Sequence, residues 1–225
     1  MKLKRMKEKM AFIEGLKKED NQSVLKKLST IQKLSQDKNS EVRQELASWL
    51  VLFDSEEIED VLYQMLFDKN GMVRLEAVDS ICMGRKEKTI EKVKTMMSDQ
   101  GYLIRAYAVL TMFDLITNCY GRNEEAFKRY EEIVAPYFHT EKNERVLMEY
   151  YHNQFHMDNE KGLELLEKSY VQAVDEGDDR LVWPLLHTFR EIKNSDNEKK
   201  IDDILNYGLE RILPVQRQLA EKIMG

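Results

Sequence analysis

Two histidines, His152 and His156, lie four residues apart in the second half of the chain. On a helix, this spacing places both imidazoles on one face, which is the geometry of a paired metal ligand. The residue after the first histidine is Asn153, whereas a zinc-protease helix carries a glutamate there. Glu149 and Asp158 are nearby in sequence but do not complete a ligand set. We therefore interpret the two histidines as an ordinary pair and predict no metal site and no cofactor.

Other sequence motifs that could indicate a catalytic or phosphate-binding site are weak or absent. The acidic pair Asp178-Asp179 stands at a predicted helix start, where carboxylates favour the helix dipole without acid–base catalysis. The sequence contains no phosphate-binding glycine loop and no Gly-x-Ser-x-Gly elbow. Neither Cys82 nor Cys119 has a flanking pattern that marks a nucleophile. We therefore expect no catalytic residues and no enzymatic activity.

A short phrase recurs along the first half of the chain. Each copy begins with aspartate and reaches an arginine six residues later, and successive copies begin 31 residues apart. The copies run from Asp37 to Arg43, from Asp68 to Arg74 and from Asp99 to Arg105. Self-similarity at a fixed period of this length is typical of stacked-repeat architectures.

Each copy predicts two helices joined by a polar turn. The first helix of a copy has apolar residues at helical spacing, as at Ile58, Val61, Leu62, Met65 and Leu66. The second helix follows the turn, with its apolar face given in the first copy by Val42, Leu46, Leu50 and Phe53. We call these two helices A and B. A single pair of short helices cannot cover its own apolar face, so neighbouring pairs must stack.

The aspartates and arginines of the phrase have a structural role in this scheme. Asp37 stands near the start of helix B, where its carboxylate is expected to accept backbone N–H groups. The constant period places the Asp and Arg columns of successive repeats side by side. We therefore expect a ladder of charged hydrogen bonds between repeats, formed by Asp37, Arg43, Asp68, Arg74, Asp99 and Arg105.

The repeated phrase resembles HEAT repeats. In that family Asp is followed after five residues by Arg, with Val or Ile just before the Arg and Ala or Leu three residues after it. The period is similar to the short bacterial subtype called PBS-lyase HEAT-like. The resemblance implies an all-α fold, an α-solenoid in which about six antiparallel helix pairs stack into a right-handed superhelix. It also implies protein–protein binding.

The rest of the chain extends this organisation. We expect a single α-solenoid domain over residues 1–225, with a basic N-terminal capping helix in 1–20, regular repeats in 21–120 and longer, divergent helix pairs in 121–225. We interpret the basic N-terminal arm (Lys2, Lys4, Arg5, Lys7 and Lys9) as a solvated helix end, and the alternative is that it contacts an anionic partner or a membrane. Residues 1–35 contain ten basic and four acidic residues, a net charge of +6, whereas the whole chain has a net charge of −6. The acidic bulk argues against nucleic-acid binding.

A helical wheel suggests where a partner binds. On the side of helix B away from the core, the residues become more apolar from one repeat to the next. The predicted partner-binding residues are Val51, Leu75, Asp79, Cys82, Leu110 and Phe113. An apolar groove there would receive a partner helix or peptide. The alternatives are that tight curvature of the stack buries the same residues, or that the N- or C-terminal helices fold across the groove.

The sequence as a whole favours a cytoplasmic adaptor or regulator that binds a protein partner, either basic or presenting an apolar helix. It contains no apolar run long enough to cross a membrane, and the two cysteines fit a reducing compartment. Two enzyme alternatives rest on the family resemblance alone. They are a DNA-binding alkylpurine DNA glycosylase built from HEAT-like repeats and a lyase-type relative of the PBS-lyase repeat proteins.

Overall fold

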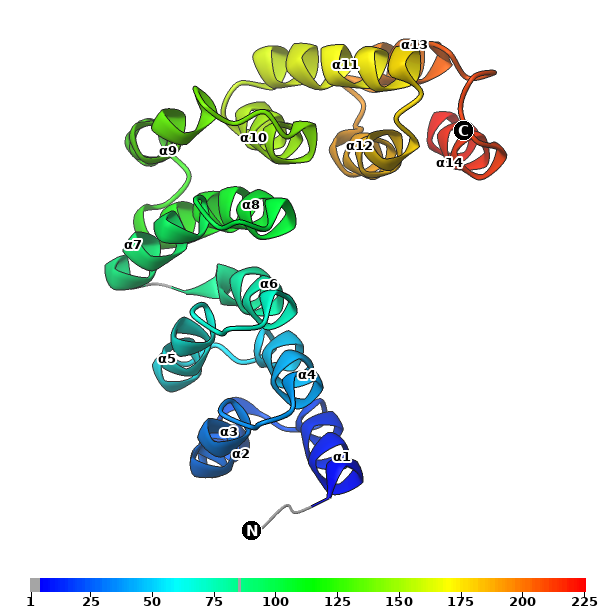
Figure 1. Ribbon diagram of the computed structural model, residues 1–225. Coiled ribbons are helices and arrows are strands. Elements are labelled where there is room, and N and C mark those ends of the chain that lie inside the picture. The colour runs from blue at the N-terminus through cyan, green and yellow to red at the C-terminus, as the bar shows by residue number, and fades with distance from the viewer. Residues whose placement is uncertain (1–4, 85) are drawn as a thin grey trace. The chain divides into compact units, whose positions relative to one another are not determined.

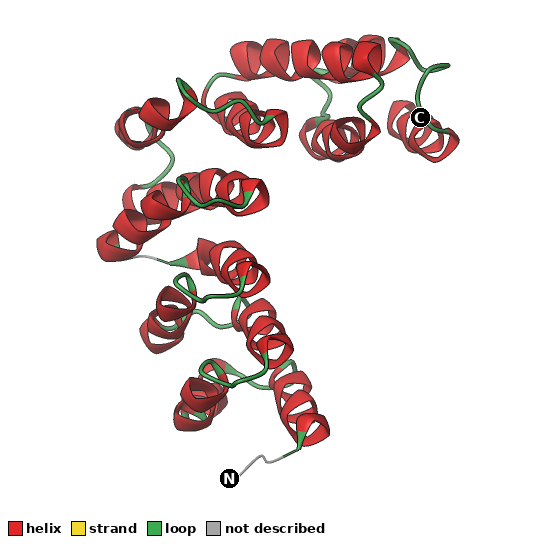
Figure 2. Cartoon of the chain, in the orientation of Figure 1, coloured by secondary structure: helices red, strands yellow, loops and turns green. Residues whose placement is uncertain are grey.

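The computed structural model describes residues 5–84 and 86–225. Within them the chain forms fourteen α-helices and one short 3-10 helix, and none of these residues lies in a β-strand (Figure 2). The predicted all-α class is therefore confirmed. Packing divides the chain into two compact units, which we call unit 1 (Met1–Glu141) and unit 2 (Lys142–Gly225). The boundary between the units falls after Glu141. The sequence predicted one continuous domain, in which regular repeats are followed by longer, divergent helix pairs from residue 121.

Unit 1 has two layers of helices (Figure 1). The A layer contains α2 (Asn21–Leu25), α3 (Leu28–Leu34), α5 (Glu56–Met65), α7 (Glu87–Met96) and α9 (Glu124–Phe138). The B layer contains α1 (Met6–Leu16), α4 (Ser40–Leu50), α6 (Gly71–Ser80), the 3-10 helix η1 (Ile81–Met83) and α8 (Tyr102–Tyr120). Along the B layer, α1 packs on α4, α4 on α6 and α6 on α8. Consecutive pairs stacked in this way form an α-solenoid, as predicted.

The predicted apolar faces form the core of unit 1. On α4 and the turn after it, Val42, Leu46, Leu50 and Phe53 are all buried. The apolar residues of α5 and its C-terminal end are buried as well: Ile58, Val61, Leu62, Met65 and Leu66. These residues recur every three or four positions, which turns one face of each helix toward its neighbours. The helical periodicity of the sequence is therefore confirmed in these two helices.

Asparagines, rather than the aspartates of the phrase, cap the B helices of the first two repeats. The side chain of Asn39 accepts the N–H of Glu41 at the start of α4, and Asn70 accepts two N–H groups in the same place on α6. Asp37 instead accepts the N–H of Asn39 at 3.0 Å. Asp37 therefore accepts a backbone N–H group, as expected, but this group belongs to the turn before the helix, because the aspartate stands two residues before the N-cap.

Helix α1 occupies the B-layer position ahead of the first repeat. Its residues Ile13 and Leu16 are buried, and Lys9 forms an ion pair with Asp37. Arg5 and Lys7 are exposed. Two further residues of the predicted basic arm, Lys2 and Lys4, lie outside the described residues. The α1 helix thus packs on α4 and continues the B layer ahead of the first repeat.

Unit 2 is also built from two layers of helices. The first layer contains α10 (Glu144–Met157), α12 (Asp179–Ile192) and α14 (Pro214–Met224), and the second contains α11 (Asn159–Glu176) and α13 (Glu198–Asn206) (Figure 1). Its core includes Tyr170 and Phe189, whose rings meet edge-on with centroids 5.7 Å apart. The described helices of both units are all too short or too polar to cross a membrane.

A glycine sets the close approach of α10 and α11. Gly162 is buried, and a Cβ atom added there would overlap the backbone of Phe155. The two helices also make the most extensive helix–helix contact in the protein's described residues. A residue without a side chain at this position therefore lets α11 pack directly on α10, which carries the two histidines.

Candidate functional site

The aspartates and arginines of the repeated phrase form a column of ion pairs along unit 1. Arg43 donates from Nε and Nη2 to the two carboxylate oxygens of Asp68, at 2.6 and 2.8 Å. Arg74 donates in the same way to Asp99, at 2.8 and 3.0 Å. Each arginine therefore binds the aspartate of the following repeat with two parallel hydrogen bonds, the strongest form of this pairing.

Each arginine also binds its own repeat. The Nη1 group of Arg43 donates to the backbone carbonyl of Asp37 at 2.5 Å, and that of Arg105 donates to the carbonyl of Asp99 at 3.0 Å. A planar guanidinium held at both ends keeps a fixed orientation. The arginine thus joins the turn of one repeat to the turn of the next, and we call this column the ladder.

Residues outside the repeated phrase terminate the ladder. At the N-terminal end, Lys9 of α1 pairs with Asp37 in place of an arginine. At the C-terminal end, Arg105 donates to both carboxylate oxygens of Glu141, at 2.7 and 3.1 Å. Sequence reasoning missed both partners, because Lys9 and Glu141 stand at intervals that differ from the 31-residue period. The ladder therefore also fixes α1 and the segment after α9 to the repeats.

The ladder carboxylates are held in their charged form. Burial raises the pKa of Asp68, but the hydrogen bonds from Arg43 and from the N–H of Asn70 outweigh it, so the net pKa is below the ordinary value. Burial also raises the pKa of Asp99, but the hydrogen bonds from Arg74 and from the N–H of Gly101 outweigh it. The pKa of Asp99 is therefore lowered as well. These hydrogen bonds hold each carboxylate in the turn between two repeats, which is a structural role.

We expect acid to weaken unit 1 through the ladder. The folded-state pKa of Asp99 lies below its unfolded value, so its contribution to stability is present above the unfolded pKa and is lost as the pH falls through the folded pKa. Between about pH 5 and about pH 2, the free energy of unfolding of the wild type should fall more steeply than that of Arg74→Ala, in which Asp99 lacks its partner. Urea denaturation at stepped pH measures both slopes, and equal slopes would contradict the expectation.

The six residues predicted to bind a partner do not all reach the surface. Phe113 is 2% exposed, and its ring lies 6.0 Å from that of Phe127 and meets Tyr130 edge-on at 5.5 Å. The prediction is wrong for Phe113, because α9 packs over this part of α8. The other five contact solvent: Asp79 is exposed, and Val51, Leu75, Cys82 and Leu110 are half-buried.

Carboxylates of α6 and α8 lie close to two of these residues, Asp79 of α6 and Cys82 of η1. Although Asp79 lies at the surface, partial desolvation raises its pKa, and the negative charge of Glu76 raises it further. The pKa of the Cys82 thiol is raised to about 11, first by burial and then by the charges of Asp114 and Asp79. These carboxylates therefore act on the same small region of unit 1. We call the set Leu75, Glu76, Asp79, Cys82, Leu110 and Asp114 the acidic–apolar surface.

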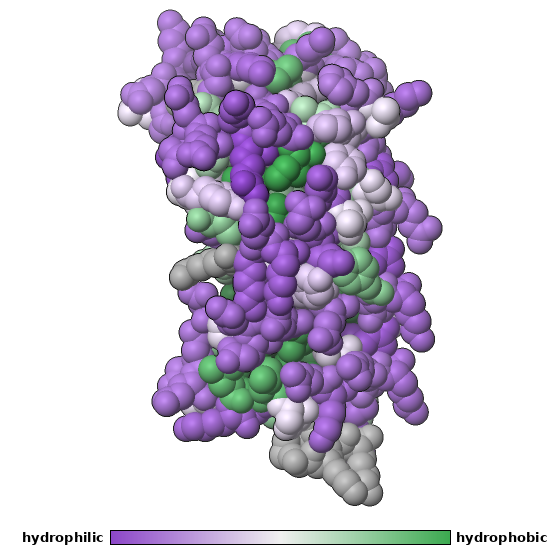
Figure 3. Space-filling model, turned by 90° about the vertical axis from the view of Figure 1, so that its left-hand side faces the viewer, coloured by the Kyte–Doolittle hydropathy of each residue, from purple (hydrophilic) through white to green (hydrophobic). Residues whose placement is uncertain are grey.

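The opposite side of unit 1, formed by the A helices, is mostly hydrophilic, with small separate hydrophobic patches (Figure 3). Lysines cover aromatic rings on this side. The Nζ atom of Lys92 lies 5.5 Å from the ring centroid of Phe67, and that of Lys88 lies 5.4 Å from the ring centroid of Tyr63. An ammonium group over an aromatic face makes a favourable cation–π contact with the ring. The aromatic rings of Phe67 and Tyr63 are therefore engaged by lysines, although Phe67 remains 52% exposed.

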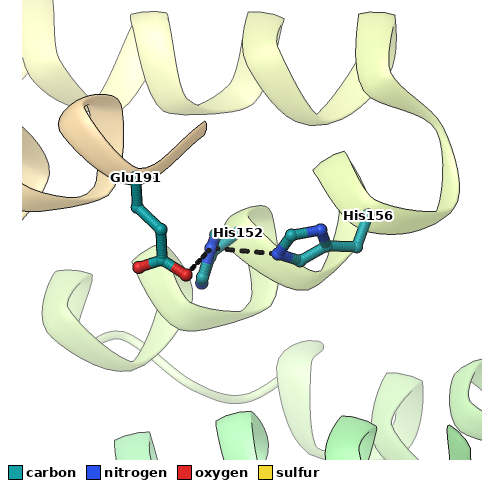
Figure 4. Close-up of side chains that lie close together, drawn as sticks. All are labelled: His152, His156 and Glu191. Carbon is teal, nitrogen blue, oxygen red and sulfur yellow. Dashed lines mark hydrogen bonds and ion pairs between the residues drawn. The ribbon is translucent and has the colours of Figure 1, made fainter. Parts of the chain in front are cut away.

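A second group of titratable side chains lies in unit 2 (Figure 4). His152 and His156 approach each other with their Nε2 atoms 3.2 Å apart, and Glu191 of α12 lies 3.8 Å from His152 Nε2. The pKa of His152 is lowered to about 4, first by burial and then by the positive charge of Arg145. Sequence reasoning found the histidines but missed Glu191, because no local pattern connects a residue on α12 to α10.

Comparison with known proteins identifies the repeats of unit 1. Residues 28–112 match the sequence model of the family described as HEAT repeats. The match begins at α3, ends within α8 and includes all three copies of the repeated phrase. No curated protein matches the chain. The sequence match, the stacked helix pairs and the interlocking ladder agree that residues 28–112 of this chain are built from HEAT repeats.

Proposed function

We propose that the protein is a non-enzymatic adaptor or regulator, and that its acidic–apolar surface binds a basic, amphipathic helical segment of a partner protein. HEAT repeats generally serve as scaffolds for protein–protein interaction, since a stack of helices offers a long surface rather than an enclosed cavity. We further place the protein in the cytoplasm, because Cys82 and Cys119 are both free thiols, as is usual in a reducing compartment.

The charge distribution on the B helices of the three repeats carries this proposal. The basic residues of α4, α6 and α8 are Arg43, Arg74 and Arg105, and each is bound in the ladder. The acidic residues of the same helices are Glu41, Glu45, Glu76, Asp79 and Asp114. The carboxylates that neutralise the three arginines belong to other segments of the chain, so the B helices retain an excess of negative charge.

A basic amphipathic helix complements this surface in two ways. Its apolar face would cover Leu75 and Leu110, which are half-buried in the free protein. Its lysines and arginines would approach Asp79 and Asp114 and offset the repulsion between the carboxylates. Because exposed charges contribute to the attraction, binding should weaken as salt is added.

Duplex DNA does not fit the same surface. Its phosphates would face carboxylates, while the arginines of the B helices are engaged in the ladder. A DNA glycosylase requires the reverse charge on the surface that receives the duplex. We therefore expect no tight binding of duplex DNA at physiological salt, and a binding assay at several salt concentrations separates the two functions.

Selection from a displayed library of helical peptides tests the proposed surface. We expect wild-type protein to enrich amphipathic helices rich in Lys and Arg. Replacing the exposed Asp79 by lysine should then raise the Kd of these peptides about tenfold or more, because an attraction becomes a repulsion. The matched control is Glu91→Lys, an equal charge change at an exposed position of α7 in the A layer. It should leave the Kd nearly unchanged.

Two outcomes would overturn the proposed surface. One is enrichment of acidic peptides or of peptides without a helical apolar pattern. The other is an equal effect of Asp79→Lys and Glu91→Lys on the Kd, since this would show that net charge rather than the acidic–apolar surface determines binding. Circular dichroism of both variants confirms that each keeps the helical fold of the wild type.

A further inference from the structure

The histidine pair of α10 has the separation that one metal ion imposes on two of its ligands. The Nε2 atoms of His152 and His156 are 3.2 Å apart. Two imidazole nitrogens bound to one tetrahedral zinc ion at about 2.0–2.1 Å are about 3.3 Å from each other. The pair arises because residues four apart lie on one face of a helix. The two nitrogens are therefore already placed to hold one ion between them.

A third ligand comes from a different helix. A carboxylate oxygen of Glu191 on α12 lies 3.8 Å from His152 Nε2, and one ligand atom from each of the three residues falls within 4.8 Å of the others (Figure 4). The side chain of Glu191 is 67% exposed, so a change of rotamer can bring its oxygen into bonding distance. Two histidines and one glutamate form a known zinc ligand set.

Two further side chains, those of Glu149 and Arg145, lie on the Nδ1 side of His152. His152 is 6% exposed, and its other ring nitrogen, Nδ1, lies 4.0 Å from Oε2 of Glu149. Arg145 donates to Oε1 of the same glutamate at 2.5 Å. A carboxylate that accepts the N–H of a ligating histidine orients the ring and increases its basicity. At 4.0 Å, Glu149 lies beyond hydrogen-bond distance and would have to move closer to do so. The ion pair with Glu149 offsets part of the positive charge of Arg145.

We propose that His152, His156 and Glu191 form a binding site for one divalent transition-metal ion such as zinc. Imidazole nitrogens favour zinc and its neighbours in the periodic table, whereas magnesium and calcium require oxygen ligands. Three protein ligands leave a fourth tetrahedral position for water or another small ligand. The exposed side of Glu191 gives the ion a route from solvent. The site lies wholly within unit 2 and is independent of the acidic–apolar surface.

Metal titration of the full-length protein tests this site. After chelator treatment and dialysis, we expect isothermal titration calorimetry to show one zinc ion per chain, and cobalt to produce the visible absorption of a tetrahedral complex. Magnesium should bind at least about a hundredfold more weakly. Glu191→Ala removes an exposed ligand and should weaken zinc binding about tenfold or more without unfolding the protein. His156→Ala should abolish the cobalt spectrum.

The control variant is His139→Ala, which removes an exposed histidine outside the cluster. It should bind zinc as the wild type does. The proposal is overturned if the wild type binds no zinc, or if Glu191→Ala and His139→Ala both retain wild-type affinity. Since Glu191 is at the surface, its variant remains informative even if His156→Ala disturbs the fold. Loss of the zinc site would leave peptide binding by unit 1 intact, and loss of peptide binding would leave the zinc site intact.

Discussion

Arg43→Ala is expected to lower the free energy of unfolding of unit 1 by about 3 kcal/mol. The arginine side chain is 4% exposed and its partner Asp68 is 11% exposed, so the substitution leaves a shielded carboxylate without its counter-charge. It also removes the donor to the carbonyl of Asp37. Urea denaturation followed by the fluorescence of Trp49 in α4 measures the change, in a Trp183→Phe background that removes the signal from unit 2.

An exposed ion pair provides the control for Arg43→Ala. Arg129 pairs with Glu87, and the two side chains are 40% and 65% exposed. Because solvent screens such a pair, Arg129→Ala should cost no more than about 1 kcal/mol. If the two alanine variants have equal effects, the buried ladder does not stabilise the repeats more than an ordinary surface pair does.

Phe113→Ala is expected to lower the free energy of unfolding by about 3–5 kcal/mol. The side chain is 2% exposed and packs against Phe127 and Tyr130 of α9, so truncation leaves a cavity between α8 and α9. The loss of two aromatic contacts adds to the cost of the cavity. Thermal and urea denaturation with the same fluorescence reporter measure the effect.

The matched control for Phe113→Ala is Tyr102→Ala, an aromatic truncation on the same helix at a side chain that is 45% exposed. Tyr102→Ala should lower the free energy of unfolding much less than Phe113→Ala does, because little of the Tyr102 ring is removed from the protein interior. If Phe113→Ala instead keeps wild-type stability and impairs peptide binding, the residue belongs to the binding surface as the helical wheel predicted. We expect the opposite result: Phe113→Ala should destabilise the protein, and the molecules that remain folded should still bind the peptide.

The period of the repeated phrase was sufficient to predict the stacking of unit 1. A constant interval between Asp68 and Asp99 means that each repeat turns the same groups toward its neighbour, so columns of like residues follow from the spacing. The apolar faces of α4 and α5 were predictable for a similar reason, since local helical periodicity determines which side chains point inward.

Contacts between segments without a shared period could not be predicted. Lys9 and Glu141 terminate the ladder, but neither belongs to the repeated phrase. The burial of Phe113 depends on where α9 packs, and a wheel drawn for one helix contains no information about a neighbour. Glu191 meets His152 for the same reason, because only the packing of α12 beside α10 brings them together.

The most direct test of the binding surface is the hydrogen–deuterium exchange footprint of a selected basic peptide on the full-length protein. Binding at the acidic–apolar surface predicts slower exchange in α6 and α8, with the A-layer helices α5 and α7 unchanged. The same protection should be absent in Asp79→Lys. Protection confined to α5 and α7, or to unit 2, would contradict the assignment of partner binding to the B helices.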